Sequence, residues 1–166
     1  MDYFINEVEQ ALITLSEVVE EANISKYSVV GSAPLVLVGL LEWANDIDIS
    51  IDKNEVPKLL AVLKKKGIIP TCYQESLYNV FRHEDILYHY DKIEDNTGFY
   101  SPPQPLIYEE IKVKSRSLKI RPIDFIIIDY ERYVKNPIDK WRLERNEYID
   151  RLRTIKERLK FISFNR

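Results

Sequence analysis

Four residues in the first third of the chain have the types and spacing for metal and phosphate chemistry. Gly31 and Ser32 are followed by thirteen residues, then by Asp46 and, two positions later, by Asp48. Carboxylates two residues apart on a β-strand project from one face with Cα atoms roughly 6.5 Å apart, so both can reach a shared pair of divalent cations. Mg²⁺ prefers such oxygen ligands. The pair therefore predicts a Mg²⁺ site at Asp46 and Asp48.

The stretch that begins with these two acids alternates strictly. In DIDISID, residues 46–52, the isoleucines share one face and the polar residues share the other, which predicts a half-buried strand. Aspartate is depleted in strands and like charges on one face repel, so the acids need a reason beyond strand propensity. A bound cation supplies that reason.

The glycine and serine precede a predicted helix. Tyr27–Val30 is short and β-prone, and Pro34 suits the first turn of a helix over residues 33–41. Glycine permits a close backbone approach, and the start of a helix offers unpaired N–H groups to a triphosphate. Gly31 and Ser32 are thus predicted to bind the phosphates of an NTP next to the metal.

The order of hydrophobic residue, Gly, Ser, thirteen residues, Asp, hydrophobic residue, Asp resembles the signature motif of the DNA polymerase β-like nucleotidyltransferase superfamily. The longer string VVGSAPLVLVGLLEWANDIDISID, residues 29–52, is similar to that of AbiEii-type toxin nucleotidyltransferases and related bacterial proteins. This resemblance implies an α+β fold. Residues 1–121 would form a nucleotidyltransferase-like core with a small mixed β-sheet flanked by helices, and residues 122–166 a C-terminal helical extension packed on it.

The same resemblance implies an activity. The expected reaction is Mg²⁺-dependent transfer of a nucleoside monophosphate from an NTP, such as ATP, to a hydroxyl of an RNA (tRNA), a protein or a small molecule. Asp46 and Asp48 would bind the metals. A third carboxylate is expected on a later strand; Asp91, within ILYHYDKI, is the first choice, as a metal ligand that also helps deprotonate the acceptor. Asp124 is the alternative, although it follows Pro122 near a helix start, where it would complement the helix dipole.

Departures from the AbiEii pattern keep a second reading open. The AbiEii-like group often has a basic residue and a Thr or Ser just before the paired acids, where this chain has EWAN, residues 42–45. The group also tends to carry a lysine in a downstream helix, at the place of Asp129. The alternative is a catalytically degenerate relative that binds a nucleotide or a protein. The toxin resemblance also implies an antitoxin protein as a partner.

Charge and composition limit the remaining function classes. The net charge is −3, yet residues 140–166 contain nine Lys and Arg against four Asp and Glu, which leaves −8 for residues 1–139. A basic tail can contact nucleic acid, but solvated helix faces are commoner. The single cysteine, Cys72, and the absence of a signal peptide or a membrane-spanning stretch predict a cytoplasmic protein with no membrane partner.

A second basic cluster could contact phosphate, or it could protect the edge of a strand from pairing with another chain. It comprises Lys112, Lys114, Arg116, Lys119 and Arg121.

The apolar periodicity places the other elements. Helical spacing predicts an amphipathic helix over residues 4–22, with Asp2 as its N-cap, and another that starts at Asn54 and ends at Gly67. Residues 68–121 are expected to form several strands. Residues 122–135 and the stripe from Trp141 to Ile162 predict two C-terminal helices.

Overall fold

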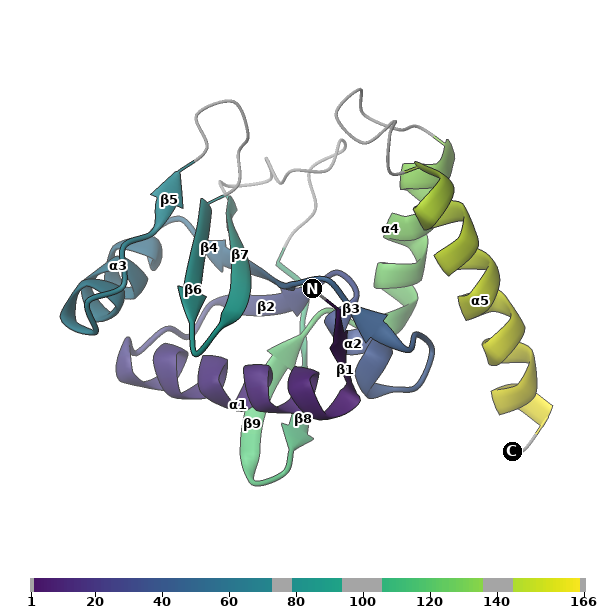
Figure 1. The fold of residues 1–166 in the computed structure, drawn as a ribbon, viewed down its shortest axis with the longest axis horizontal. Coiled ribbons are helices and arrows are strands. Elements are labelled where there is room, and N and C mark those ends of the chain that lie inside the picture. The colour runs from purple at the N-terminus through teal and green to yellow at the C-terminus, as the bar shows by residue number, and fades with distance from the viewer. Residues whose placement is uncertain (1, 73–78, 94–105, 136–144, 165–166) are drawn as a thin grey trace.

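The computed structural model describes residues 2–72, 79–93, 106–135 and 145–164 of the chain and shows the expected α+β fold (Figure 1). Its elements in chain order are β1 (Tyr3–Phe4), α1 (Ile5–Glu21), β2 (Tyr27–Val30), α2 (Ala33–Leu37), β3 (Trp43–Ala44), β4 (Ile47–Asp52), α3 (Val56–Lys65), β5 (Thr71–Cys72), β6 (Asn79–His83), β7 (Ile86–Ile93), β8 (Glu109–Val113), β9 (Arg116–Ile120), α4 (Ile123–Lys135) and α5 (Arg145–Phe164).

Seven strands form the main sheet, in the order β5-β6-β7-β4-β2-β9-β8. The pairs β4–β7 and β2–β9 are parallel, and the other neighbours are antiparallel, so the sheet is mixed as expected. The strands β2 and β4 lie at its centre. β1 and β3 form a separate two-stranded sheet in which Phe4 is paired with Trp43.

The alternation in β4 gives the strand one apolar, buried face and one polar face. Ile47, Ile49 and Ile51 are fully buried, whereas Asp48 and Asp52 on the other face are only half-buried. The long helix α1 crosses beneath the sheet, with α3 beside it (Figure 1). α1 buries an apolar stripe that includes Val8, Leu12 and Leu15. The hydrophobic effect on this stripe fixes which face of β4 points away from the core.

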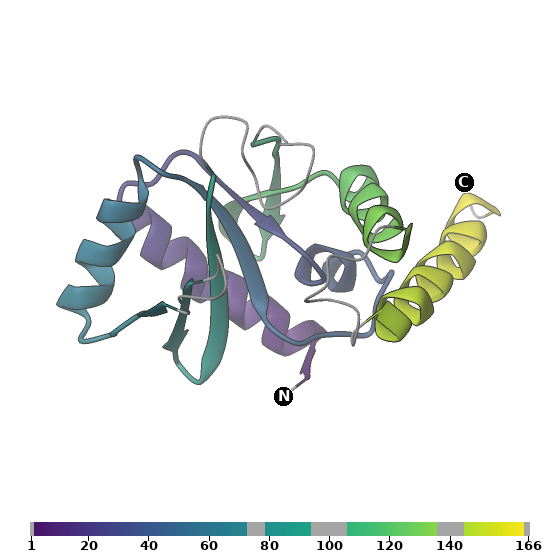
Figure 2. The ribbon, with the colours of Figure 1, turned by 90° about the horizontal axis from the view of Figure 1, so that it is seen from above.

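The two C-terminal helices lie side by side at the end of the molecule opposite α3 (Figure 2). Ile126 and Tyr130 of α4 and Ile155 of α5 are buried in the same hydrophobic cluster as the sheet. Tyr148 of α5 makes an edge contact with Tyr130 at a centroid separation of 5.4 Å. Of the helices described, none combines the length and the apolar character needed to span a membrane.

Three predicted helix boundaries are wrong. The N-cap of α1 is Phe4 rather than Asp2. The helix that starts after Ser32 ends at Leu37 rather than at residue 41, because Gly39 adopts a left-handed φ of +75°. α3 begins after Glu55 rather than at Asn54, whose N–H is donated to the Asp52 carboxylate at 2.9 Å. The predicted end of α3 is confirmed, since Gly67 has a φ of +72° just after the last turn.

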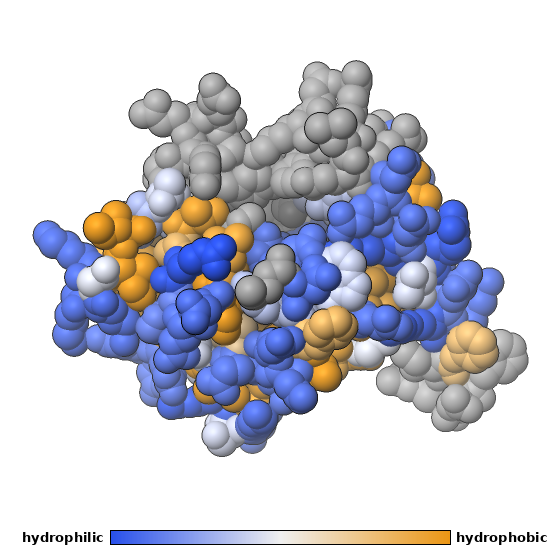
Figure 3. All heavy atoms as spheres, in the orientation of Figure 1, coloured by the Kyte–Doolittle hydropathy of each residue, from blue (hydrophilic) through white to orange (hydrophobic). Residues whose placement is uncertain are grey.

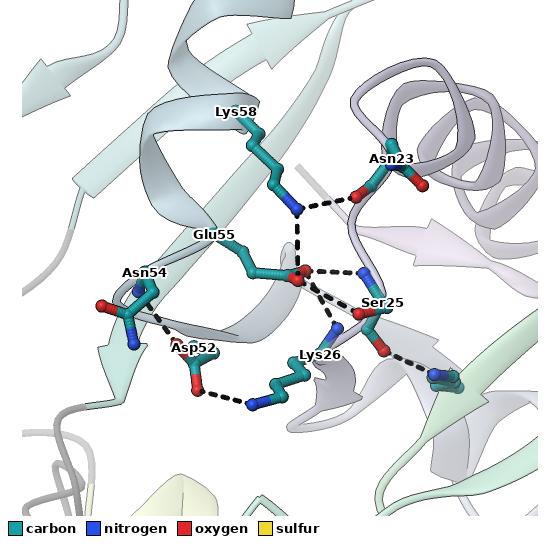
Figure 4. A network of polar contacts seen from close by, with 8 residues as sticks. Asn23, Ser25, Lys26, Asp52, Asn54, Glu55 and Lys58 are labelled. Carbon is teal, nitrogen blue, oxygen red and sulfur yellow. Dashed lines mark hydrogen bonds and ion pairs between the residues drawn. The ribbon is translucent and has the colours of Figure 1, made fainter.

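A buried carboxylate anchors the end of β4 that is remote from the aspartate pair (Figure 4). Glu55 accepts hydrogen bonds from the N–H groups of Ser25, at 2.6 Å, and Lys26, at 3.0 Å, and it also contacts Lys58. These contacts tie the turn after β4 to the chain entering β2. Burial opposes ionisation of Glu55, but the donors at Lys26 and Ser25 bring its pKa below the usual value.

We expect Glu55→Gln to destabilise the protein by about 1–3 kcal/mol at neutral pH, because the buried N–H groups lose a charged acceptor. A depressed folded-state pKa gives stability that is complete above the unfolded pKa of about 4.3 and is lost as the pH falls through the folded value. Urea unfolding at several pH values should show this loss in wild type. In Glu55→Gln, the free energy of unfolding should depend less steeply on pH. Glu17→Gln is the control, since its ion pair with Arg116 is exposed. Parallel pH profiles for wild type and Glu55→Gln would contradict the assignment.

Candidate active site

The predicted glycine and the second aspartate meet at the centre of the sheet. β2 and β4 are antiparallel and pair Val30 with Asp48, so the turn that follows β2 lies over the start of β4. Gly31 has a φ of +70°, and a Cβ atom built on it would lie 2.2 Å from Oδ2 of Asp48. No side chain can occupy that space. The Asp48 carboxylate therefore lies directly against the backbone of the glycine turn.

The serine lies in the same turn. Ser32 is buried and directly precedes α2, and its carbonyl accepts the hydrogen bond from the Val36 N–H at 3.1 Å. Its hydroxyl makes no capping hydrogen bond. Because α2 has only five residues, its dipole adds little charge at this end. Any contribution to phosphate binding would come from the N–H groups of the turn itself.

Asp46 directly precedes β4 and is half-buried, like Asp48. Among the side chains that the structure describes, which do not include those of Cys72, His89 and Asp91, no three His, Cys, Asp or Glu groups converge to hold a metal. Mg²⁺ is commonly held by one or two carboxylates together with substrate phosphates, rather than by a cage made only of protein groups. Two aspartates beside a glycine turn fit that mode of binding.

The third carboxylate stays a prediction. Asp91 lies in β7, where its backbone is paired with Ser50 of β4, two residues beyond Asp48. The side chain of Asp91 falls outside the described part of the structure. Asp124, the alternative, is exposed in the first turn of α4, where a carboxylate complements the helix dipole.

Two aromatic residues and one arginine, which the sequence analysis did not assign to the site, lie together near the segment that leads into β4. Burial raises the pKa of Tyr130 to about 12; the nearby charge of Arg151 opposes this rise, and that of Asp48 adds to it. The guanidinium of Arg151 stacks on the Trp43 ring at 4.2 Å from its centroid. α5 thus meets the segment that leads into β4 through the contact of Arg151 with Trp43. Only the position of Trp43, three residues before Asp46, could have indicated this from the sequence.

A buried ion pair lies beside the glycine turn. Arg121 follows β9 and donates its backbone N–H to the Val29 carbonyl at 2.8 Å, which places it next to the end of β2. Nε of Arg121 donates to Oδ2 of Asp129 at 2.7 Å, and both side chains are 7% exposed. Burial raises the pKa of Asp129, and the arginine opposes that rise. Asp129, which stands where the AbiEii-type pattern has a lysine, is therefore matched by the cation that follows β9.

A pocket of about 560 Å³ opens between α5 and the segment that leads into β4. Asn45 and Glu147 approach each other at 3.4 Å across this boundary. The volume is within the range of small-molecule sites. Its lining residues are Leu41, Glu42, Trp43, Glu147, Asp150, Arg151 and Thr154.

The basic clusters noted in the sequence largely face the chain's own acids. In the β8–β9 hairpin, Lys114 pairs with Glu9, and Arg116 pairs with Glu17 and Glu20, all three acids belonging to α1. Figure 3 shows that hydrophilic side chains cover most of this part of the surface. α5 shows the same behaviour, through the pairs Arg151–Glu147, Arg153–Asp150, Lys156–Glu131 and Arg158–Glu42. These pairs favour a structural role over nucleic-acid binding for the six basic residues that make them.

We expect Gly31→Ala to destabilise the protein by more than the roughly 1–3 kcal/mol of backbone strain alone, because the added Cβ must also displace the Asp48 carboxylate. Gly39→Ala is the matched control, since its φ is +75° and its Cβ would meet nothing within 4 Å. Urea unfolding of both variants would distinguish two costs. Both variants share the cost of backbone strain, and only Gly31→Ala has the added cost of moving the Asp48 carboxylate. Equal losses in the two variants would show that Asp48 does not require the glycine.

For the Arg121–Asp129 pair, we expect either Arg121→Met or Asp129→Leu alone to cost about 3–5 kcal/mol, because each leaves an uncompensated buried charge. The double variant should recover most of that loss. Denaturant unfolding of the four proteins forms the double-mutant cycle. Additive losses would mean that the two side chains do not compensate each other's charge.

Comparison with known proteins supports the fold. No protein-family model matches the chain, and no curated protein matches its sequence. Two solved structures do match. The lincomycin-bound lincosamide antibiotic adenylyltransferase LnuA is 14% identical, with a TM-score of 0.59 over 88% of this chain and 96% of that chain. A candidate nucleotidyltransferase from Thermotoga maritima is 17% identical, with a TM-score of 0.54 over 90% of this chain and 94% of that chain. The chain therefore has the fold of the nucleotidyltransferases.

Proposed function

We propose that this chain transfers a nucleoside monophosphate from an NTP to a hydroxyl group, with Mg²⁺ bound at Asp46 and Asp48. The observation that carries the proposal is the contact between the Gly31 backbone and the Asp48 carboxylate, which joins the glycine turn to the acidic strand in one site. The similarity in fold to an adenylyltransferase supports the same reaction.

Each residue has a role that follows from its position. Asp46 and Asp48 would hold Mg²⁺, which neutralises charge on the phosphates and activates the attacking oxygen when bound. Gly31 and Ser32 would let the phosphates approach the N–H groups of their turn. Asp91 would hold the proton that leaves the acceptor hydroxyl. Pyrophosphate would leave as the bond to the hydroxyl oxygen forms.

We propose a small molecule as the acceptor, ahead of RNA. The pocket of about 560 Å³ next to Trp43 is of a suitable size, and LnuA, which is similar in fold, acts on lincosamide antibiotics. Of the basic residues that favoured tRNA, Arg151, Arg153, Lys156 and Arg158 are paired with acids of the same chain. A tRNA acceptor, an antitoxin partner and a bacterial toxin role rest on the AbiEii resemblance alone, and a cytoplasmic location rests on the sequence composition.

The test is a transfer assay with each α-³²P-labelled NTP, Mg²⁺ and two acceptor pools, one of hydroxyl-bearing antibiotics and one of total tRNA. We expect label to move to the small molecules, and a fall of at least about 100-fold with either Asp46→Asn or Asp48→Asn, because each removes a charged metal ligand. Asp52→Asn is the control, since this acid of the same strand face caps a turn instead. If Asp46→Asn and Asp48→Asn both transfer label as wild type does, the proposed metal site at these two aspartates is wrong.

The same variants separate an active enzyme from a degenerate relative. Calorimetry should detect Mg²⁺-dependent NTP binding in wild type and not in the Asp46→Asn, Asp48→Asn double variant. Binding without transfer to either pool would favour the degenerate reading. Absence of both would overturn the proposed function.

A further inference from the structure

We infer that the outer edge of β8 pairs with the same strand of a second copy of this chain, in antiparallel orientation, so that two seven-stranded sheets join into one. β8 is the last strand of the main sheet, and its neighbour there is β9. The hairpin that these two strands form extends beyond α1 (Figure 1). The inference concerns Glu110 and Lys112, and it does not rest on the proposed function.

The backbone groups of Glu110 and Lys112 point away from β9. In and after β9, the N–H groups of Lys119 and Arg121 are donated to acceptors on β2, at 3.3 Å and 2.8 Å. Successive residues of a strand bond toward opposite sides, so the even-numbered residues of β9 bond to β8. Their partners in β8 are its odd-numbered residues. Glu110 and Lys112 therefore present their N–H and C=O groups at the outer edge of the sheet.

The side chains of Glu110 and Lys112 are available to a second copy. Both are exposed, and neither makes an ion pair with another residue that the structure describes. The cations at the tip of the hairpin differ, because Lys114 and Arg116 pair with acids of α1. Lys119 lies opposite Glu110 in β9, but its Nζ donates to a carbonyl in the turn before β2. One anion and one cation of β8, two residues apart, thus remain for an outside partner.

These two charges select one register for the pairing. When two edges share hydrogen bonds, an outward-pointing residue of one copy must lie opposite an outward-pointing residue of the other. A register that sets Glu110 against Glu110, or Lys112 against Lys112, opposes like charges and is destabilised. The register centred on Ile111 sets Glu110 of each copy against Lys112 of the other. By two-fold symmetry this attraction occurs twice, and each pair exchanges both of its N–H···O hydrogen bonds.

The rest of β8 fits pairing better than protection of the edge. Charged residues protect an edge by repelling the same residues of another chain, and proline does so by removing a donor. β8 has no proline, and its charges attract in the register centred on Ile111. On the face toward α1, Ile111 is only partly buried and would pack against its own counterpart. Because β8 has five residues, the contact is smaller than the roughly 1,200 Å² of standard interfaces, and the dimer is weak.

The experiment measures the dimerisation constant of the full chain by sedimentation at about 10–500 µM, a range suited to a small interface. Wild type should pass from monomer to dimer across this range. Glu110→Lys and Lys112→Glu should each weaken dimerisation by about 10-fold or more, because each places like charges opposite one another twice. The two single variants mixed together should associate as wild type does, because each then meets opposite charges. The double variant with both substitutions should also regain the wild-type constant.

Lys64→Glu is the control for net charge, since Lys64 is exposed in the last turn of α3, away from β8. It should leave the dimerisation constant within about twofold of wild type, because exposed charges that are far apart are screened. A wild type that stays monomeric throughout the range would overturn the inference. So would a dimer that both single variants form as well as wild type does, because another surface would then hold it. Failure of the mixed variants to associate would show that Glu110 and Lys112 do not face each other.

Discussion

The site depends on a residue that has no side chain. With any Cβ at position 31, Oδ2 of Asp48 would have to move, and the pairing of Val30 with Asp48 leaves the strand little freedom to do so. The left-handed φ of Gly31 reverses the chain immediately after β2, so the turn covers the acid rather than running past it. Close approach and chain reversal are thus two consequences of one glycine, and together they place the turn proposed to bind phosphate next to the carboxylate proposed to bind the metal.

The polar residues of β4 make different contacts at the two ends of the strand. At its start, Asp48 lies against the glycine turn. At its end, Asp52 accepts the N–H of Asn54 and lies 3.9 Å from Lys26, while Glu55 holds the chain entering β2. The strand is therefore fixed at the end away from the proposed chemistry, and its buried isoleucines fix its face.

The central elements could be predicted from the sequence because strong local patterns determine them. Strict alternation identified β4, and a glycine after a lysine run identified the end of α3. The length of α2 could not be predicted, since Val38 to Leu41 continue its apolar character and only the left-handed φ of Gly39 ends the helix. Tyr130 and Arg151 were missed for another reason. They lie roughly a hundred residues from the aspartates, and their positions depend on how α4 and α5 pack.

Charge was the least informative property in the sequence, because a count of basic residues does not give their partners. The basic tail suggested an RNA surface, yet Arg153, Lys156 and Arg158 each face a carboxylate. What distinguishes a ligand-binding cation from a structural one is the desolvation of its partner. A carboxylate buried with its arginine cannot leave without stranding a charge, whereas one that reaches water can be exchanged for a substrate anion at small cost.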